Sequence, residues 1–174
     1  MTRTMIGKVY AIQPQPPVEE NMRYFDAGAL RFGVEYRALD PESLIETYKD
    51  RPAELAEMLE KSPEGGFADE GVTVHVFDAT DGYEYLRFDM FDDEPHYHYI
   101  HKTTDGSIVN NVLDFDVPSH GDMLPFVFQA LRTRLPEMLE QAGGDTLARK
   151  VDAATVEHAL VDVEACCIQA RRGT

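Results

Sequence analysis

Four runs of residues that alternate between apolar and polar side chains lie between positions 71 and 116, and short turn signals separate them. Alternation with period two is the pattern of a β-strand with one buried face. The separating segments are rich in residues that favour tight turns, and they are Thr80-Asp81-Gly82, Asp92-Asp93-Glu94-Pro95 and Thr104-Asp105-Gly106. The pattern therefore predicts four consecutive antiparallel strands joined by short turns.

Two further strands are expected before this stretch, over residues 5–12 and 30–38, where apolar and polar residues also alternate. The segment between them begins with Gln13-Pro14-Gln15-Pro16-Pro17, and proline cannot donate a hydrogen bond to a strand ladder. We interpret residues 13–28 as a connection, which serves as a lid, an edge-covering loop or a surface arm. Together, these segments predict a sheet of about six strands.

Three helical regions are expected beside the sheet. The first follows Asp40 and is kinked or restarted at residues 50–52, because a proline there interrupts the backbone hydrogen bonding. The second follows Asp122 and is kinked at Pro136, and the last runs from about 154 to 170. The two C-terminal helices carry apolar stripes, so we expect them to cover the apolar face of the sheet.

The length of 174 residues and an apolar content of 43% suit one domain with a hydrophobic core. We therefore predict a single α+β domain over residues 1–174. Its antiparallel, meander-rich sheet has helices packed on one face, and the other face forms a pocket or a dimer interface.

Acidic residues outnumber basic ones by 32 to 16, which gives a formal net charge of -16. This charge disfavours binding to nucleic-acid phosphates or to an anionic membrane surface. No segment approaches the about 20 apolar residues of a membrane helix, and residues 1–8 lack the apolar core of a signal peptide. Cys166 and Cys167 are neighbours, which rarely bridge, so we expect both to be reduced. These features together predict a cytoplasmic protein.

Turn lengths predict which residues face one another across the sheet, because each turn type fixes the register of its two strands. The expected pairs are Ala79–Tyr83, Val74–Phe88, His75–Arg87, Asp89–His98, Phe91–His96, Asp114–His96 and Val112–His98. These registers bring polar and aromatic residues together on the face opposite the apolar one, namely His75, Tyr85, Arg87, Asp89, His96, His98, Asn110 and Asp114.

An open, solvated face would be expected to carry Lys, Glu and Thr, and this face instead combines imidazoles, aromatic rings, a guanidinium and carboxylates. Aromatic walls with a few convergent polar groups are typical of a ligand pocket. Tyr, Phe and Arg are also enriched at homodimer interfaces. Both interpretations stay open from the residues alone.

Three of the six histidines lie between positions 96 and 101, interleaved with tyrosines. His96 and His98 are two residues apart on a strand, so their side chains point the same way with Cα atoms about 7 Å apart. Two such imidazoles can bind one transition metal ion, either Zn, Fe, Cu or Ni. They can also act without a metal as a general acid and base, or be ordinary strand histidines.

The remaining residues of the face receive roles from their chemistry. Asp89 is expected to orient an imidazole through its ring N–H, and Arg87 to bind a substrate carboxylate or stabilise an oxyanion. The catalytic candidates are thus His98, His96, Asp89 and Arg87, and the substrate-binding candidates are Tyr85, His75, Asn110 and Asp114. The sequence predicts a small-molecule-binding protein that acts as an enzyme, using a metal ion or a His/Asp/Arg acid–base set on the open sheet face. The alternative is a non-catalytic homodimeric or partner-binding module that buries the same face.

Overall fold

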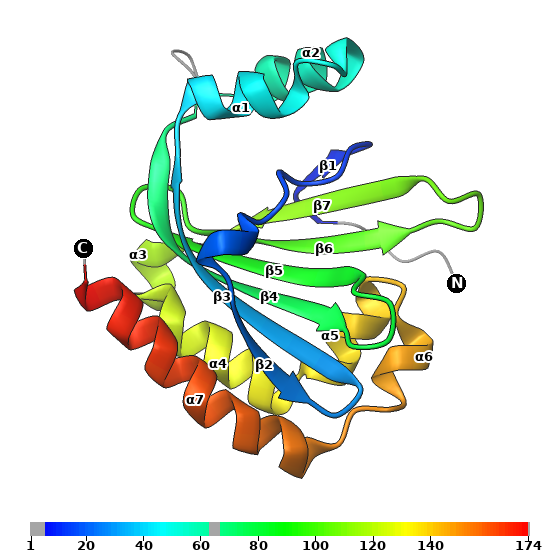
Figure 1. The fold of residues 1–174 in the computed structure, drawn as a ribbon, viewed down its shortest axis with the longest axis vertical. Helices are drawn as coiled ribbons and strands as arrows, with labels where there is room; N and C mark the ends of the chain where they lie inside the picture. The colour runs from blue at the N-terminus through cyan, green and yellow to red at the C-terminus, as the bar shows by residue number, and fades with distance from the viewer. Residues whose placement is uncertain (1–5, 63–66, 174) are drawn as a thin grey trace.

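The computed structural model describes residues 6–62 and 67–173, which form an α+β fold around one antiparallel sheet (Figure 1). Within these residues the sheet has seven strands in the order β1-β7-β6-β5-β4-β3-β2. Their bounds are β1 (Lys8–Tyr10), β2 (Arg23–Ala27), β3 (Leu30–Leu39), β4 (Asp69–Asp78), β5 (Glu84–Phe91), β6 (His96–Lys102) and β7 (Ile108–Asp114). Strands β2 to β7 are neighbours in sequence and in space, so the predicted meander is confirmed, and β1 pairs with β7.

The seventh strand is β2, which lies inside the predicted connection 13–28 and was not expected. It forms one edge of the sheet, and only Ala27 of its five residues is buried, so its sequence lacks the alternation of a half-buried strand. The strand expected over residues 5–12 is shorter, since β1 covers only three residues; residue 5 lies outside the described part of the chain.

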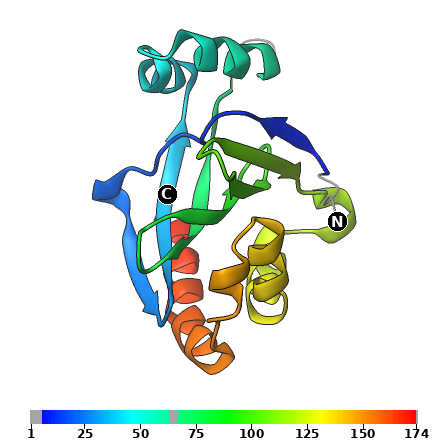
Figure 2. The same cartoon turned by 90° about the vertical axis from the view of Figure 1, so that its right-hand side faces the viewer.

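Helices from the C-terminal third of the chain cover one face of the sheet (Figures 1 and 2). Their bounds are α3 (Val117–His120), α4 (Met123–Thr133), α5 (Leu135–Gln141), α6 (Asp145–Ala148) and α7 (Ala153–Arg172). Apolar side chains of both layers form the core, and Val74, Phe88, Phe128, Leu139 and Leu160 are fully buried in it. The prediction that the C-terminal helices cover the apolar sheet face is confirmed.

The helix expected after Asp122 is divided in two rather than kinked. Arg134 has a φ of -132°, outside the helical range, and it separates α4 from α5. Pro136 lies in the first turn of α5, where a missing N–H breaks no helical hydrogen bond. The proline therefore begins a new helix instead of bending an old one.

Two helices, α1 (Pro41–Tyr48) and α2 (Pro52–Lys61), lie apart from the others, at the top of Figure 1. The interruption expected at residues 50–52 is confirmed. Leu44 of α1 and Met58 of α2 contribute to a pocket over the polar sheet face, so the prediction that the helices pack on one face only is wrong for this pair. The strand pattern could not predict this, because α1 and α2 reach that face from the ends of β3 and β4.

The registers agree with the expected pairs at four places: Val74–Phe88, His75–Arg87, His96–Asp114 and His98–Val112. The expected pair Ala79–Tyr83 is wrong, because the Asp78 amide donates to the Tyr83 carbonyl at 2.9 Å. The turn is therefore one residue longer than predicted. A β-bulge near Val76 absorbs the extra residue, since Val76 pairs with Leu86 and Phe77 with Glu84.

The turn between β5 and β6 is also longer than predicted. Asp89 pairs with His96, and Arg87 pairs with His98, so the expected pairs Asp89–His98 and Phe91–His96 are wrong by two residues. Because side chains alternate between faces with period two, a shift of two leaves each of them on its predicted face.

Searching residues 6–62 and 67–173 gives no helix with the length and apolar character that a membrane crossing requires.

Candidate functional site

A pocket of about 390 Å³ lies over the polar face of the sheet. This volume is in the range of about 300–1,000 Å³ that small-molecule sites occupy. Its polar lining includes Arg37, Arg87, Asp89, His96, His98, Asn110 and Asp114, and its apolar lining includes Leu39, Leu44, Met58, Phe67 and Phe91. The polar face is therefore covered by α1, α2 and the segment around Gln15 from the same chain, with the pocket between them.

Asp89, His96 and His98 form a compact cluster in this pocket, which we call the His–Asp cluster. Oδ2 of Asp89 lies 2.9 Å from Nε2 of His98 and 3.2 Å from Nε2 of His96. The side chains are 4%, 14% and 8% exposed for Asp89, His96 and His98. The cluster arises because β5 and β6 pair Asp89 with His96, and the period-two geometry brings His98 to the same face.

Each member of the His–Asp cluster is held by a further hydrogen bond. Nδ1 of His96 lies 2.7 Å from the Glu94 carbonyl oxygen, and Nδ1 of His98 lies 2.8 Å from Oδ1 of Asn110. The hydroxyl of Thr73 donates to Oδ1 of Asp89 at 2.5 Å. These contacts fix the ring orientations and leave both Nε2 atoms and Oδ2 directed at one another.

The partner of His96 Nδ1 determines where its ring carries hydrogen. A backbone carbonyl can only accept, so Nδ1 of His96 must be the donor to Glu94. Nε2 then presents a lone pair to the Asp89 carboxylate unless a second proton or a metal ion is there. A lone pair facing a carboxylate oxygen at this distance is repulsive, so a positive charge belongs between His96 and Asp89.

His98 does not decide this point by itself. With Oδ1 of Asn110 toward it, Nδ1 of His98 is a donor, and Nε2 likewise presents a lone pair to Asp89. An Asn110 amide turned end for end would donate to Nδ1, and Nε2–H would then donate to the carboxylate. The contacts of His96 alone therefore require the positive charge beside Asp89.

Burial and charge act in opposite directions on the pKa values of the cluster. Burial lowers the pKa of each imidazole and the Asp89 carboxylate raises it; the net pKa is raised for His96 and lowered for His98. Burial would raise the pKa of Asp89, but its hydrogen bonds with the two imidazoles hold that pKa well below its usual range. Asp89 is thus an anion, and His98 is largely neutral at neutral pH.

The donor atoms of the His–Asp cluster can converge on one ion. One ligand atom from each of Asp89, His96 and His98 lies within 4.8 Å of the other two. Metal-bound histidines almost always donate their second ring N–H to a carbonyl or carboxylate, as His96 does to Glu94, and as His98 does to Asn110 when Oδ1 of that amide faces the ring. The cluster therefore has both the ligand atoms and the outer hydrogen bonds of a metal site.

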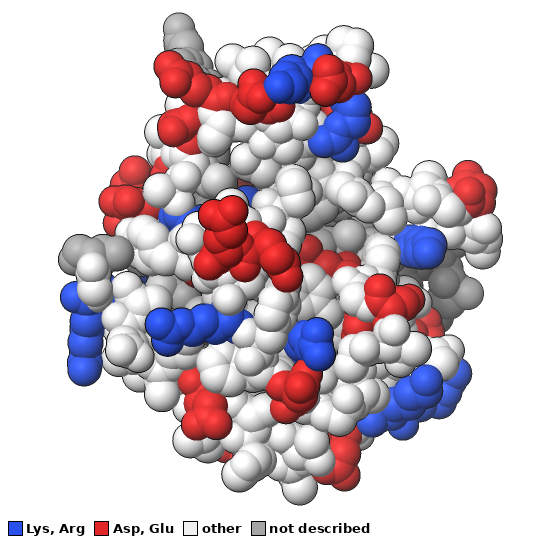
Figure 3. Space-filling model, viewed as in Figure 1, with Lys and Arg blue, Asp and Glu red and all other residues white. Residues whose placement is uncertain are grey.

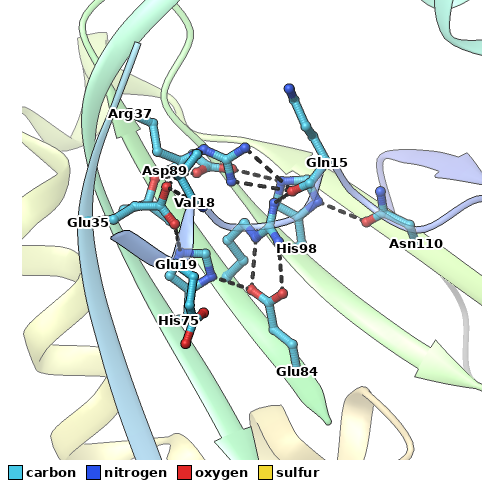
Figure 4. A network of polar contacts seen from close by, with 12 residues as sticks. Gln15, Val18, Glu19, Glu35, Arg37, His75, Glu84, Asp89, His98 and Asn110 are labelled. Carbon is cyan, nitrogen blue, oxygen red and sulfur yellow. Dashed lines mark hydrogen bonds and ion pairs between the residues drawn. The ribbon is translucent and has the colours of Figure 1, made fainter. Parts of the chain in front are cut away.

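A second group of charges lies beside the cluster, and we call it the ion network: Glu35, His75, Glu84 and Arg87. Figure 4 labels the first three of these residues. His75 is fully buried, with Nε2 2.9 Å from Glu35 and Nδ1 2.5 Å from Glu84. Burial lowers its pKa, but the two carboxylates outweigh burial and raise it. Arg87 donates from Nε and Nη2 to the two oxygens of Glu84, both at 2.8 Å.

Gln15, from the Pro-rich segment, links this network to the pocket. Its carbonyl oxygen accepts from Nη1 of Arg87 at 2.7 Å and from both terminal nitrogens of Arg37 at 3.4 and 3.5 Å (Figure 4). Its side chain donates to Thr47 of α1 at 3.0 Å. The connection over residues 13–28, which we expected to be a lid, an edge-covering loop or a surface arm, thus supplies a wall of the pocket.

The structure brings together seven of the eight residues that the sequence placed on this face. Six of them line the pocket, and His75 lies beneath it in the ion network. The placement of Tyr85 is wrong: it packs against the hydrophobic core, with its ring beside Gly144. The bulge in β5 is the reason, because it turns Tyr85 to the helix-covered face and directs Glu84 to the polar face instead.

Several residues of the site were not among the sequence candidates, and the main ones are Glu35, Arg37, Glu84, Thr73 and Gln15. Glu35 and Arg37 alternate with apolar residues in β3, and Thr73 shares the parity of His75 in β4, so a register between these strands would have included them. Gln15 gives no such signal, since it acts through its backbone carbonyl.

Comparison with protein families matches residues 24–167 to a domain of unknown function, DUF7700. Searches of curated proteins and of solved structures gave no match.

Proposed function

The chain belongs to the DUF7700 family, a domain of unknown function, and on that premise we propose from its geometry that the pocket is a metal-dependent site for a small molecule. Asp89, His96 and His98 would hold a divalent transition metal ion. The ion would present its free coordination positions to the pocket, and the rest of the cavity would receive the ligand.

One observation carries this proposal. His96 uses Nδ1 for the Glu94 carbonyl, so its Nε2 lone pair is directed at Oδ2 of Asp89, which requires a cation between them. A divalent ion in that place would be coordinated by both atoms and by Nε2 of His98. Burial favours a divalent ion over protons shared between Asp89 and the two imidazoles. It lowers the pKa of His98, which keeps that imidazole neutral, as a metal ligand must be.

Two imidazoles and one carboxylate suit Zn, Fe, Cu or Ni, in line with the metals expected from the sequence. Three protein ligands leave positions open, which is typical of catalytic rather than structural sites. When bound, such an ion polarises an oxygen of the ligand or lowers the pKa of a bound water. Arg87 and Asn110 line the same pocket and would position the ligand.

The alternative without a metal is a His–Asp acid–base pair, in which a second proton on His96 supplies the positive charge. The raised pKa of His96, where the effect of Asp89 exceeds that of burial, favours this alternative. The homodimer interpretation has less support, because α1, α2 and the Gln15 segment already lie over the polar face.

Metal content measured by mass spectrometry and titration calorimetry on untagged protein would test the proposal. We expect one Zn²⁺ per chain with at least micromolar affinity. His96→Ala and Asp89→Asn should each weaken binding at least tenfold, since each removes one of three ligands. His158→Ala is the matched control, because His158 is an exposed histidine on α7.

Two results would overturn the metal site. One is a wild-type protein that takes up no Zn²⁺, Fe²⁺, Cu²⁺ or Ni²⁺ at concentrations of about 100 μM, well above the affinity expected here. The other is equal affinity in His96→Ala and His158→Ala, which would place the bound ion elsewhere. Circular dichroism of each variant would show whether the fold is retained.

A further inference from the structure

The pocket also carries information about the chemical class of its ligand, and this information comes mainly from Arg37. Its side chain is only 4% exposed, and it lines the pocket. An arginine has five N–H donors. Among the described residues, the hydrogen bonds from Arg37 are two long ones, both to the Gln15 carbonyl oxygen, at 3.4 and 3.5 Å.

Within the part of the chain that the structure describes, Nε of Arg37 has no hydrogen-bond partner, and its nearest carboxylate oxygen, on Glu35, is 3.8 Å away. A buried charged donor left in this way is costly, because charged groups are normally satisfied by short hydrogen bonds. Burial lowers the pKa of Arg37, which reflects the same incomplete compensation. The guanidinium therefore has capacity for an acceptor that enters the pocket.

Arg87 strengthens this point, because it directs Nη1 to the same Gln15 oxygen at 2.7 Å. Two guanidinium groups thus converge on one neutral carbonyl. Together with Arg37, the ion network and the His–Asp cluster contain three carboxylates, Glu35, Glu84 and Asp89, and two guanidinium groups, Arg37 and Arg87. With the divalent ion of the proposed function at the His–Asp cluster, these charges would sum to a net positive pocket floor.

The rim of the pocket limits how much negative charge a ligand can carry. Asp40, Glu94 and Asp114 lie there with Lys8 and Lys61, so the rim is not basic. Figure 3 likewise shows acidic and basic side chains interspersed over the face it draws. A group with a single negative charge suits this balance better than a dianionic phosphate. The fork of an arginine also matches a planar carboxylate.

One part of the pocket wall is apolar. Leu39, Leu44 and Met58 line it together with the rings of Phe67 and Phe91. Such a wall receives hydrocarbon or aromatic groups, and it gives no hydrogen bonds to a second polar end. The ligand is thus expected to have one charged end and one apolar end.

We infer that the pocket binds an amphipathic carboxylic acid, whose carboxylate meets Arg37 and Arg87 beside the His–Asp cluster and whose apolar body packs against Leu44, Met58 and Phe91. This inference rests on the proposed function for the metal that faces the same carboxylate. It goes beyond that function by naming the class of ligand.

Fluorine NMR of the full chain with 4-fluorobenzoate as the probe would test the inference, with and without Zn²⁺. The uncharged 4-fluorobenzyl alcohol has the same ring and serves as the matched ligand. We expect 4-fluorobenzoate to bind at least tenfold more tightly than the alcohol, because hydrogen bonds between a guanidinium and a carboxylate are charge-assisted and stronger than those to an uncharged hydroxyl. Inorganic phosphate at equal concentration should not displace it.

Variants of Arg37 assign the effect to this side chain. Arg37→Met should weaken 4-fluorobenzoate binding at least tenfold while the affinity for Zn²⁺ stays within twofold of wild type. Arg37→Lys keeps the charge and should weaken binding less, so it substitutes for Arg37→Met should that variant fail to fold. Arg31→Met, on the same strand and 45% exposed, should bind as wild type does.

Equal binding of the alcohol and the benzoate, displacement of the benzoate by phosphate, or equal binding by Arg37→Met and Arg31→Met would each overturn the inference. These failures differ from failure of the metal site. A protein that binds Zn²⁺ but not the benzoate would contradict only the ligand class. Binding of the benzoate through Arg37 in a chain that takes up no metal would contradict only the proposed function.

Discussion

Replacing Arg87 with methionine should strongly destabilise the fold, because the ion network is buried and Arg87 is one of its central cations. The side chain is 2% exposed and makes two bonds to Glu84 at 2.8 Å and one to the Gln15 carbonyl at 2.7 Å. Such bonds contribute about 1.5–3 kcal/mol each. Loss of the guanidinium also removes its own desolvation cost, so we expect a net loss near the about 3–5 kcal/mol found when one partner of a buried ion pair is removed.

Urea denaturation followed by circular dichroism would measure this loss. The slope of the free energy of unfolding against urea concentration should stay the same, since the surface exposed on unfolding hardly changes. Arg31→Met removes an exposed pair with Asp26 and should change the free energy of unfolding by less than about 1 kcal/mol. A loss below about 1 kcal/mol for Arg87→Met, similar to that control, would refute the idea that the ion network stabilises the fold.

Two further predictions concern the ion network and the C-terminal helix. Burial lowers the pKa of His75 but Glu84 and Glu35 raise it above 6.5 overall, so its imidazolium stabilises the fold fully below pH 6.5 and this contribution declines as pH rises through the raised pKa. Urea denaturation of His75→Gln should therefore show a flatter dependence of stability on pH above 6.5 than wild type, and parallel profiles would contradict this assignment. Asp152 caps α7 by accepting from the Thr155 amide at 2.8 Å, so Asp152→Ala should lower the free energy of unfolding by about 0.5–2 kcal/mol. Asp162→Ala, at an exposed position within α7, is the control, and equal losses in the two variants would show that the cap contributes nothing.

The face of the sheet to which each strand residue points, its parity, was predictable from the sequence. This parity was enough to identify most residues of the site. Arg87, Asp89, His96 and His98 reached one face although the turn between β5 and β6 is longer than expected. The error in register was two residues, and an even shift preserves the face. Strand parity is therefore a more robust prediction than the identity of directly opposite residues.

Tyr85 and Glu84 show where parity fails. A single extra residue in β5 places Tyr85 on the helix-covered face of the sheet and Glu84 on the polar face. Neither residue next to Tyr85 is a glycine or proline, which would have indicated a bulge. The length of the preceding turn decides the bulge, and turn length is set by tertiary contacts such as the Ala79 amide with the Ala29 carbonyl. Local sequence does not report such contacts.

The sequence pattern also did not predict that other parts of the chain cover the polar face. Helices α1 and α2 were predicted, but the positions of their apolar side chains do not indicate which face of the sheet they pack against. Gln15 contributes a backbone carbonyl, which every residue has. These parts of the pocket depend on where the chain returns in space, and they became visible only in the fold.

Anomalous diffraction at the zinc edge, from crystals of the Zn²⁺-loaded protein, would test the central claim most directly. We expect one strong peak among Oδ2 of Asp89, Nε2 of His96 and Nε2 of His98, at about 2.0–2.2 Å from each, with Nδ1 of His96 still on the Glu94 carbonyl. A peak at surface carboxylates only, with His96 and Asp89 still in direct contact at 3.2 Å, would contradict the metal site and leave a protonated His96 as the cation.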